Sequence, residues 1–154
     1  MRADWDSTWL KVAKAMAGRS QCVNRQVGCV VVDPDNRPVS VGYNGAPAGY
    51  KVEGPCSGYC PRGASQVRGS GYGNCVSVHA EANALIFADR RTYSGGTIYI
   101  TNPCCFDCAK LVANSGVSRV VWIESDADKH ADTTTPADFL RDCGLEVAIQ
   151  RRRK

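Results

Sequence analysis

Long hydrophobic runs are missing from this 154-residue sequence, which holds no stretch of the roughly 20 apolar residues that a membrane helix requires. Its first six residues carry two acids and no apolar segment, so we expect no secretory signal and a cytoplasmic protein. Excess charge is missing from the body of the chain, because the net charge of +4 equals the contribution of the last four residues, Arg151, Arg152, Arg153 and Lys154. The sequence therefore predicts no membrane partner, and its neutral body argues against nucleic-acid binding.

The remaining composition is that of one globular domain. Hydrophobic residues make up 44% and charged residues 22%, both near the averages for globular proteins, and no internal repeat is present. We predict a single domain over residues 1–154. Its nine cysteines, without a secretory signal, favour metal binding or catalysis over a disulfide framework.

The first third of the sequence predicts a helix followed by a hairpin. Apolar residues recur every three or four positions from Trp5 to Met16, which indicates an amphipathic helix ending near Gly18, with Trp5 and Trp9 in the core. Two runs with strand character, 27–32 and 38–43, flank a turn at 33–36, so we expect them to pair antiparallel.

Residues 45–75 interrupt this regularity with eight glycines, three prolines and three cysteines, and we predict neither helix nor strand there. A loop of this length in a compact domain is usually functional or disordered, and the cysteines favour order. Helices and strands then alternate through 80–90, 97–101, 105–116, 120–124, 135–144 and 145–149. Right-handed crossovers would make these strands parallel, which predicts an α/β fold with a mixed five-stranded sheet covered by helices.

Two short motifs supply ligands that zinc prefers. Cys105 and Cys108 lie three residues apart at the start of a helix, where they share one face and where we expect both to be thiolates. With His79 they give three ligands, which leaves the fourth tetrahedral position for water, as in a catalytic zinc site. Glu81 lies two residues beyond His79, so we predict that it faces the water, whose pKa zinc lowers to about 7, and shuttles its proton.

The choice between Cys104 and Cys105 stays open at this point. Pro103 directly precedes Cys104, whereas the two-residue gap before Cys108 selects Cys105. A closed structural zinc site using both cysteines with Cys108 and His79 is the alternative, but it leaves Glu81 without a role.

These motifs together resemble the deoxycytidylate (dCMP) deaminases of the cytidine deaminase superfamily, from about Trp5 to Ile149. The residues that carry the resemblance are His-Ala-Glu-Ala-Asn-Ala at 79–84, Gly-Tyr-Asn-Gly-Ala-Pro at 42–47, and Val-Gly at 27–28. His-x-Glu with Pro-Cys-x-x-Cys is the signature of zinc nucleobase deaminases. In the related Thr-x-x-Pro-Cys-x-x-Cys-Ala pattern, counting from Thr101 selects Cys105.

The resemblance implies a cytidine-deaminase-like fold, hydrolysis of dCMP to dUMP and ammonia for dTMP synthesis, and a homohexamer activated by dCTP and inhibited by dTTP. It places the substrate sugar at Asn44 and the phosphate at Arg25, although Arg25 is shifted by one position and Asn24 occupies the matching place. It also implies a magnesium-dependent regulatory nucleotide site at Gly42, Tyr43, Asn44 and Gly45, coupled to the active site by Phe87 and Arg90. Some relatives bind a second, structural zinc, for which Cys22, Cys56, Cys60 and Cys75 are the candidate ligands.

Three other functions remain as alternatives. A tRNA or single-stranded DNA deaminase would share the zinc site but would need a basic or aromatic groove. A free-nucleoside cytidine deaminase is a further alternative. A non-catalytic zinc module would keep the fold as a binding surface and would not need Glu81. The basic tail, residues 150–154, has no assigned role.

Overall fold

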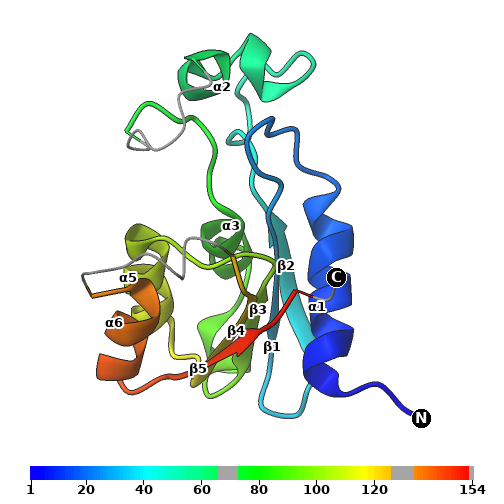
Figure 1. Ribbon diagram of the computed structural model, residues 1–154, viewed down its shortest axis with the longest axis vertical. Coiled ribbons are helices and arrows are strands. Elements are labelled where there is room, and N and C mark those ends of the chain that lie inside the picture. Colours follow the sequence, from blue (N-terminus) through cyan, green and yellow to red (C-terminus); the bar gives the residue numbers. More distant parts are fainter. Residues whose placement is uncertain (66–72, 126–133, 153–154) are drawn as a thin grey trace.

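The computed structural model describes residues 1–65, 73–125 and 134–152 of the chain. Its centre is one five-stranded mixed sheet in the order β2-β1-β3-β4-β5 (Figure 1). Strand β1 pairs antiparallel with both β2 and β3, whereas β3, β4 and β5 are parallel. The bounds are Gly28–Val32 for β1, Pro38–Tyr43 for β2, Thr97–Ile100 for β3, Arg119–Ile123 for β4 and Glu146–Gln150 for β5. The predicted hairpin and parallel portion are both confirmed.

Helices cover both faces of the sheet and make a three-layer structure (Figure 1). Helix α1 (Trp5–Ala17) packs on one face, with Trp9, Leu10 and Ala13 against the strand residues Val30, Val32, Tyr99 and Val121. The opposite face carries α3 (Ala80–Ile86), α5 (Phe106–Ser115) and α6 (Pro136–Asp142). All five residues of β1 are buried, because this strand lies inside the sheet with helices on either side.

The helix ends follow from local sequence. Helix α5 begins after Cys105 and ends at Gly116, whose φ of 101° is the left-handed conformation that glycine adopts readily. Helix α6 begins with Pro136 after a capping box between Thr135 and Asp138. Both starts and the end of α5 agree with the sequence-based expectation.

Two expectations from the helical pattern were wrong. Trp5 is 56% exposed, because it is the first residue of α1 and stacks on the ring of Trp9 instead of entering the core. The helix predicted over 80–90 is broken: α3 ends at Ile86, and a short α4 (Arg90–Tyr93) follows. Asp89 causes the restart, since its side chain accepts a hydrogen bond from the Arg91 N–H and caps α4.

The glycine-rich stretch at 45–75 also contains regular structure that the sequence did not predict. A 3₁₀ turn, η1 (Cys56–Gly58), leads into α2 (Pro61–Ser65), and Gly45 forms a β-bridge with Val78. Residues 66–72 of this stretch, like Arg153 and Lys154 of the tail, lie outside the described residues. Figure 1 shows η1 and α2 beyond one end of the sheet. No helix in the described part of the chain is both long and apolar enough to cross a membrane.

One edge of the sheet collects the ends of several strands. The pairings of Gly28 with Tyr43 and of Cys29 with Ile100 put the start of β1 beside the carboxyl ends of β2 and β3. Because β3, β4 and β5 are parallel, their carboxyl ends lie along the same edge. Ligands of α/β proteins bind in the crevice outside such carboxyl ends, so this edge is where a site is expected.

Candidate active site

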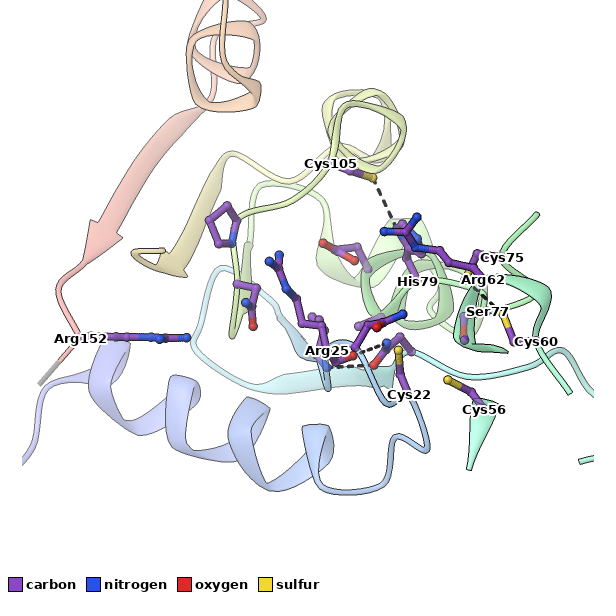
Figure 2. A pocket seen from close by; sticks show the side chains of 18 residues that line it. Cys22, Arg25, Cys56, Cys60, Arg62, Cys75, Ser77, His79, Cys105 and Arg152 are labelled. Carbon is purple, nitrogen blue, oxygen red and sulfur yellow. Dashed lines mark hydrogen bonds between the residues drawn. The ribbon is translucent and has the colours of Figure 1, made fainter. Parts of the chain in front are cut away.

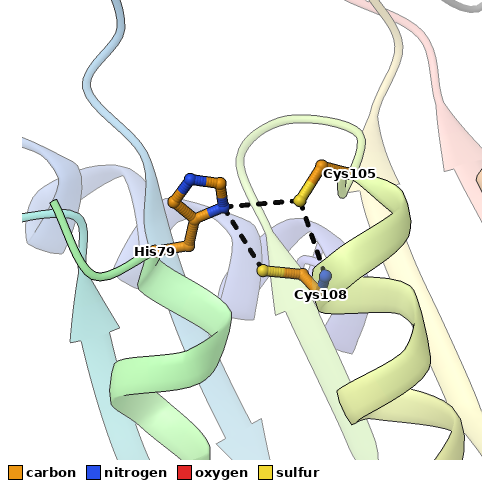
Figure 3. A group of neighbouring side chains, drawn as sticks. All are labelled: His79, Cys105 and Cys108. Atoms are coloured by element: carbon orange, nitrogen blue, oxygen red, sulfur yellow. Dashed lines mark hydrogen bonds between the residues drawn. The ribbon is translucent and has the colours of Figure 1, made fainter. Parts of the chain in front are cut away.

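Three side chains converge where α3 and α5 begin (Figure 3). His79 is the N-cap residue of α3 and Cys105 that of α5, and Cys108 lies in the first turn of α5. The His79 Nδ1 lies 3.4 Å from the Cys105 Sγ and 3.4 Å from the Cys108 Sγ. Usual zinc bond lengths in a tetrahedral centre place such nitrogen and sulfur atoms about 3.5 Å apart, so this donor set fits zinc in chemistry and in spacing. Among the described residues it is the one group of three or more His, Cys, Asp or Glu side chains close enough to share an ion.

The fold holds these two helix starts together through a common core. Ala80 and Ala84 of α3 and Cys108 and Ala109 of α5 belong to the same buried cluster on one face of the sheet. Small residues at these positions allow the helices to approach closely. The convergence of the three side chains therefore depends on the packing of both helices and not on the motifs alone.

Interactions among the protein groups alone shift the pKa values of the two thiols in opposite directions. Hydrogen bonds from Cys108 and His79 lower the pKa of the Cys105 thiol to about 4, although burial opposes them. The same hydrogen bond with Cys105, together with burial, raises the pKa of the Cys108 thiol far above its usual value. A bound divalent cation would supply the positive charge that two adjacent thiolates require.

Glu81 has the environment of a group that exchanges protons. It is 4% exposed, and burial raises the pKa of its carboxyl above the ordinary value. It lines the same pocket as His79 and Cys105. A buried carboxyl beside a metal site can accept a proton from water and deliver it to a substrate atom.

The pocket has a volume of about 670 Å³ and runs along the sheet edge described above (Figure 2). Its walls come from the segment before β1, the end of β2, the cysteine-rich segment, the start of α3, the loop after β3 and the chain after β5. Its lining includes residues that were not predicted from the sequence, among them Arg62, Asn102 and Arg152. No local motif marks them, because each enters the site only through the fold.

Asn44 lies in this pocket wall, where it is 8% exposed. Its side-chain oxygen accepts a hydrogen bond from the Val27 N–H at 2.8 Å, and its side-chain nitrogen donates to the Arg25 carbonyl at 2.8 Å. Asn44 therefore fixes the backbone from which the Arg25 side chain enters the pocket.

The other residues of the 42–45 motif have clear structural roles. Any side chain at Gly42 would meet the backbone of α3, since an added Cβ would lie 2.3 Å from the Ala80 oxygen. The Tyr43 carbonyl accepts a hydrogen bond from the Asn83 side chain at 2.8 Å, and Gly45 bridges to Val78. The 42–47 motif is thus hydrogen-bonded directly to the 79–84 motif.

The remaining candidates occupy different places. Phe87 is 79% exposed, Arg90 is also exposed, and neither lines the pocket. Cys104 is 3% exposed and lies in the apolar core instead of in the His79 cluster. Asn24 and Arg25 both line the pocket.

The four cysteines considered for a second metal line the side of the same pocket that lies away from Arg152: Cys22, Cys56, Cys60 and Cys75 (Figure 2). The Cys60 and Cys75 sulfurs lie 3.9 Å apart, and the Val23 N–H donates to the Cys56 Sγ. Burial raises the pKa of the Cys60 thiol, but backbone N–H groups of residues 62, 63 and 76 outweigh it and lower that pKa overall.

Comparison with known proteins supports the chemistry of the site. Residues 3–124 match the model of the cytidine and deoxycytidylate deaminase zinc-binding region. The chain belongs to this family.

Individual members of this family are similar to the chain over most of its length. The deoxycytidylate deaminase of Mycobacterium phage D29 is 48% identical over 125 residues, which cover 79% of this chain and 95% of the phage protein. The deoxycytidylate deaminase of Saccharomyces cerevisiae is 36% identical over 81% of this chain, which spans 39% of the yeast protein. The crystal structure of cyanophage S-TIM5 dCMP deaminase in complex with dCMP and dUMP superposes with a TM-score of 0.73 at 25% identity, covering 97% of this chain and 99% of the phage chain.

Proposed function

We propose that this protein is a zinc-dependent dCMP deaminase, which hydrolyses dCMP to dUMP and ammonia and so supplies dUMP for dTMP synthesis. The observation that carries the proposal is the convergence of His79, Cys105 and Cys108 beside the buried Glu81 at one end of an arginine-lined pocket. Its support includes the names of the phage and yeast relatives and the dCMP and dUMP bound to the cyanophage enzyme.

In this proposal, the histidine and two cysteines hold the zinc ion. Bound zinc supplies Lewis acidity, which makes water a strong nucleophile near neutral pH. Glu81 would take one proton of that water and deliver it to N3 of the cytosine as the oxygen adds to C4. It would then carry the second proton, from the hydroxyl now on C4, to the amine, which leaves as ammonia while the C4 carbonyl forms. The raised pKa of its carboxyl suits this role, because the group can hold the proton between the two transfers.

The rest of the pocket is suited to a nucleotide. We assign the sugar to Asn44 and the phosphate to Arg25, whose guanidinium can form paired hydrogen bonds with phosphate oxygens. The hydrogen bond between the Asn44 side chain and the Arg25 carbonyl would fix the spacing between these two contacts.

The test uses zinc-loaded protein and follows ammonia release from dCMP, deoxycytidine, dCTP and cytosine-containing single-stranded DNA. We expect turnover of dCMP, and we expect Glu81→Gln to lower it by about 10²- to 10⁴-fold while the zinc content stays unchanged. A Glu81→Gln variant with a sustained rate would overturn the proton-shuttle role. Wild-type activity on DNA but not on dCMP would assign the protein to a nucleic-acid deaminase function, and silence on every substrate would favour a binding module.

Regulation is part of the proposal. By family resemblance, we place a magnesium-bound triphosphate at Gly42 to Gly45 of a homohexamer, with dCTP as activator, dTTP as inhibitor, and Phe87 and Arg90 linking this site to the active site. Sedimentation of the protein with and without each triphosphate and magnesium tests the assembly. If the rate of dCMP deamination is the same with and without dCTP or dTTP, the regulatory part alone would be overturned.

A second, structural zinc is the last part of the proposal. The shared pocket wall of the four cysteines and the 3.9 Å separation of the Cys60 and Cys75 sulfurs support it, and zinc binding would draw the four sulfurs closer together than they lie in this structure. Gly63 of α2 also packs so tightly on η1 that an added Cβ would lie 2.7 Å from the Cys56 oxygen. Metal analysis tests it: two zinc ions per chain, falling to one in Cys60→Ser, are expected, and one ion in both proteins would overturn it.

A further inference from the structure

The pocket contains three arginines that come from three distant parts of the chain. Arg62 belongs to α2 and lies on the same side of the pocket as His79 and Cys75 in Figure 2. Arg152 enters from the opposite side, and Arg25 lies between them. A nucleotide is also elongated, with the base at one end, the sugar in the middle and the phosphate at the other end, so it can lie across the pocket from the His79 side to Arg152.

Resting on the proposed function, we propose that Arg152 of the C-terminal tail is a specificity-determining residue that binds the 5′-phosphate of the substrate opposite Arg25. With the cytosine at His79 and Glu81, the sugar reaches Asn44, whose side chain is hydrogen-bonded to the Arg25 carbonyl, and the phosphate extends toward the end where Arg152 enters.

The position of the tail follows from the sheet. Strand β5 is parallel to β3 and β4, so the chain that leaves it passes the edge at which the pocket lies. The Glu124 N–H donates to the Gln150 carbonyl at 2.8 Å, which fixes the backbone two residues before Arg152. The Arg152 side chain therefore extends from an anchored segment of backbone, although the side chain itself is exposed.

The charge balance of the pocket supports an anion at this end. Of the three arginines in its lining, Arg25 and Arg152 lie away from the side of His79 and Arg62 (Figure 2), and the single carboxylate in the lining, Glu81, is two residues from His79. Guanidinium groups bind phosphate through short, charge-assisted and often paired hydrogen bonds. Two arginines from separate segments of the chain would recognise the phosphate more selectively than one.

The neighbouring Arg151 provides a matched control. It carries the same charge and is also exposed, but it does not line the pocket.

The experiment compares kcat/KM for dCMP and deoxycytidine, together with the affinities for dUMP and deoxyuridine measured by calorimetry, in wild type, Arg152→Ala, Arg152→Lys and Arg151→Ala. We expect Arg152→Ala to raise KM for dCMP and Kd for dUMP about tenfold, the lower end for a hydrogen bond to a charged group, because the side chain is exposed to screening solvent. The kcat/KM for deoxycytidine and the Kd for deoxyuridine should stay unchanged. Arg152→Lys should recover part of the lost affinity for dCMP and dUMP, and Arg151→Ala should match wild type.

Two results would overturn the inference while leaving the proposed function intact. One is an Arg152→Ala variant whose kcat/KM for dCMP and Kd for dUMP are unchanged. The other is a variant that loses affinity and kcat/KM equally for the nucleotides and the nucleosides. An equal loss in Arg151→Ala would also overturn it, because the effect would then come from tail charge in general. A wild-type protein that neither deaminates dCMP nor binds dUMP would instead overturn the proposed function, and this inference with it.

Discussion

Cys104 and Cys105 are neighbours in the sequence, yet their side chains lie in different environments. Cys105 caps α5 and faces His79, whereas Cys104 packs in the apolar core near Cys108. The residues alone left the choice between them open, because Pro-Cys spacing selects one and Cys-x-x-Cys spacing selects the other. The start of α5 decides the geometry, since only the capping residue lies beside the Cys108 backbone N–H.

A pair of single substitutions tests this difference. We expect Cys105→Ala to lose the zinc of the His79 site and all deamination, because two ligands remain on the protein. Cys104→Ala should keep that zinc and most of the activity, with a cost in stability from the small cavity. Metal content and dCMP turnover of the two purified variants check the prediction, and the reverse pattern would assign the ligand to Cys104.

At the same scale, the arginines mark a limit of sequence reasoning. His79, Glu81 and the cysteine pair lie in short local motifs, so the sequence identified them as candidates. Helix geometry predicted the shared face of Cys105 and Cys108, whereas their approach to His79 comes from the packing of α3 and α5. Arg62 and Arg152 have no motif around them, and their place in the pocket depends on where α2 and β5 end. The spacing of apolar residues does not carry that information.

Among the elements, the contact of α3 with β2 positions the catalytic end of α3. Gly42 faces Ala80 and Ala84, and an added Cβ would lie 2.3 Å from the Ala80 oxygen and 2.7 Å from the Ala84 nitrogen. Backbone atoms cannot move aside as side-chain ends do, so α3 would have to shift as a unit. His79 and Glu81 would shift with it.

We therefore expect Gly42→Ala to lower the free energy of unfolding by about 1–3 kcal/mol and to lower dCMP turnover as well. Gly45→Ala is the matched control in the same motif, because its Cβ would meet only the Tyr43 ring, at 3.6 Å, an ordinary contact distance. Its change in unfolding free energy should stay within about 0.5 kcal/mol. Urea denaturation of both variants, with rates measured in parallel, tests this, and equal losses in the two would contradict the packing argument.

Elements were predictable where one local signal dominated. The capping box at Thr135 and the glycine at 116 set helix ends that the sequence predicted closely. The break after Ile86 was missed because the apolar pattern continues past it, while Asp89 starts a new helix by capping. The helix α2 was missed because glycine and proline dominate its surroundings, and its order comes from packing on η1.

For the molecule as a whole, the layered fold was predictable because alternation of strand and helix restricts the topology strongly. The active-site pocket was predictable only in part, since it forms where chain segments from residues 22 to 152 meet at one sheet edge. Contacts between residues far apart in the sequence also hold α1 to the sheet. Apolar packing does most of this, together with one ion pair that links the first helix to β4.

That ion pair gives a pH-dependent contribution to stability. Arg119 donates to both Asp6 oxygens at 2.7 and 2.8 Å, and the Tyr99 hydroxyl donates to Asp6 at 3.0 Å. Hydrogen bonding by Arg119 lowers the pKa of Asp6 below its ordinary value of 3.8, against the effect of burial. Because the folded pKa is the lower one, the stabilisation is fully present above the unfolded pKa and is lost as the pH falls through the folded pKa.

Asp6→Asn should consequently lower the free energy of unfolding by about 1.5–3 kcal/mol at neutral pH, the range for hydrogen bonds to a charged group. The gap to wild type should stay constant between about pH 7 and pH 5 and narrow below about pH 4, as the wild-type carboxylate takes up its proton. Glu146→Gln is the control, because Glu146 pairs with the same Arg119 but its side chain is 68% exposed, so the loss should be under about 1 kcal/mol. Urea unfolding across this pH range tests the prediction. A gap that widens on acidification would show that Asp6 is not ionised in the folded protein, and the link between α1 and β4 would then be apolar packing alone.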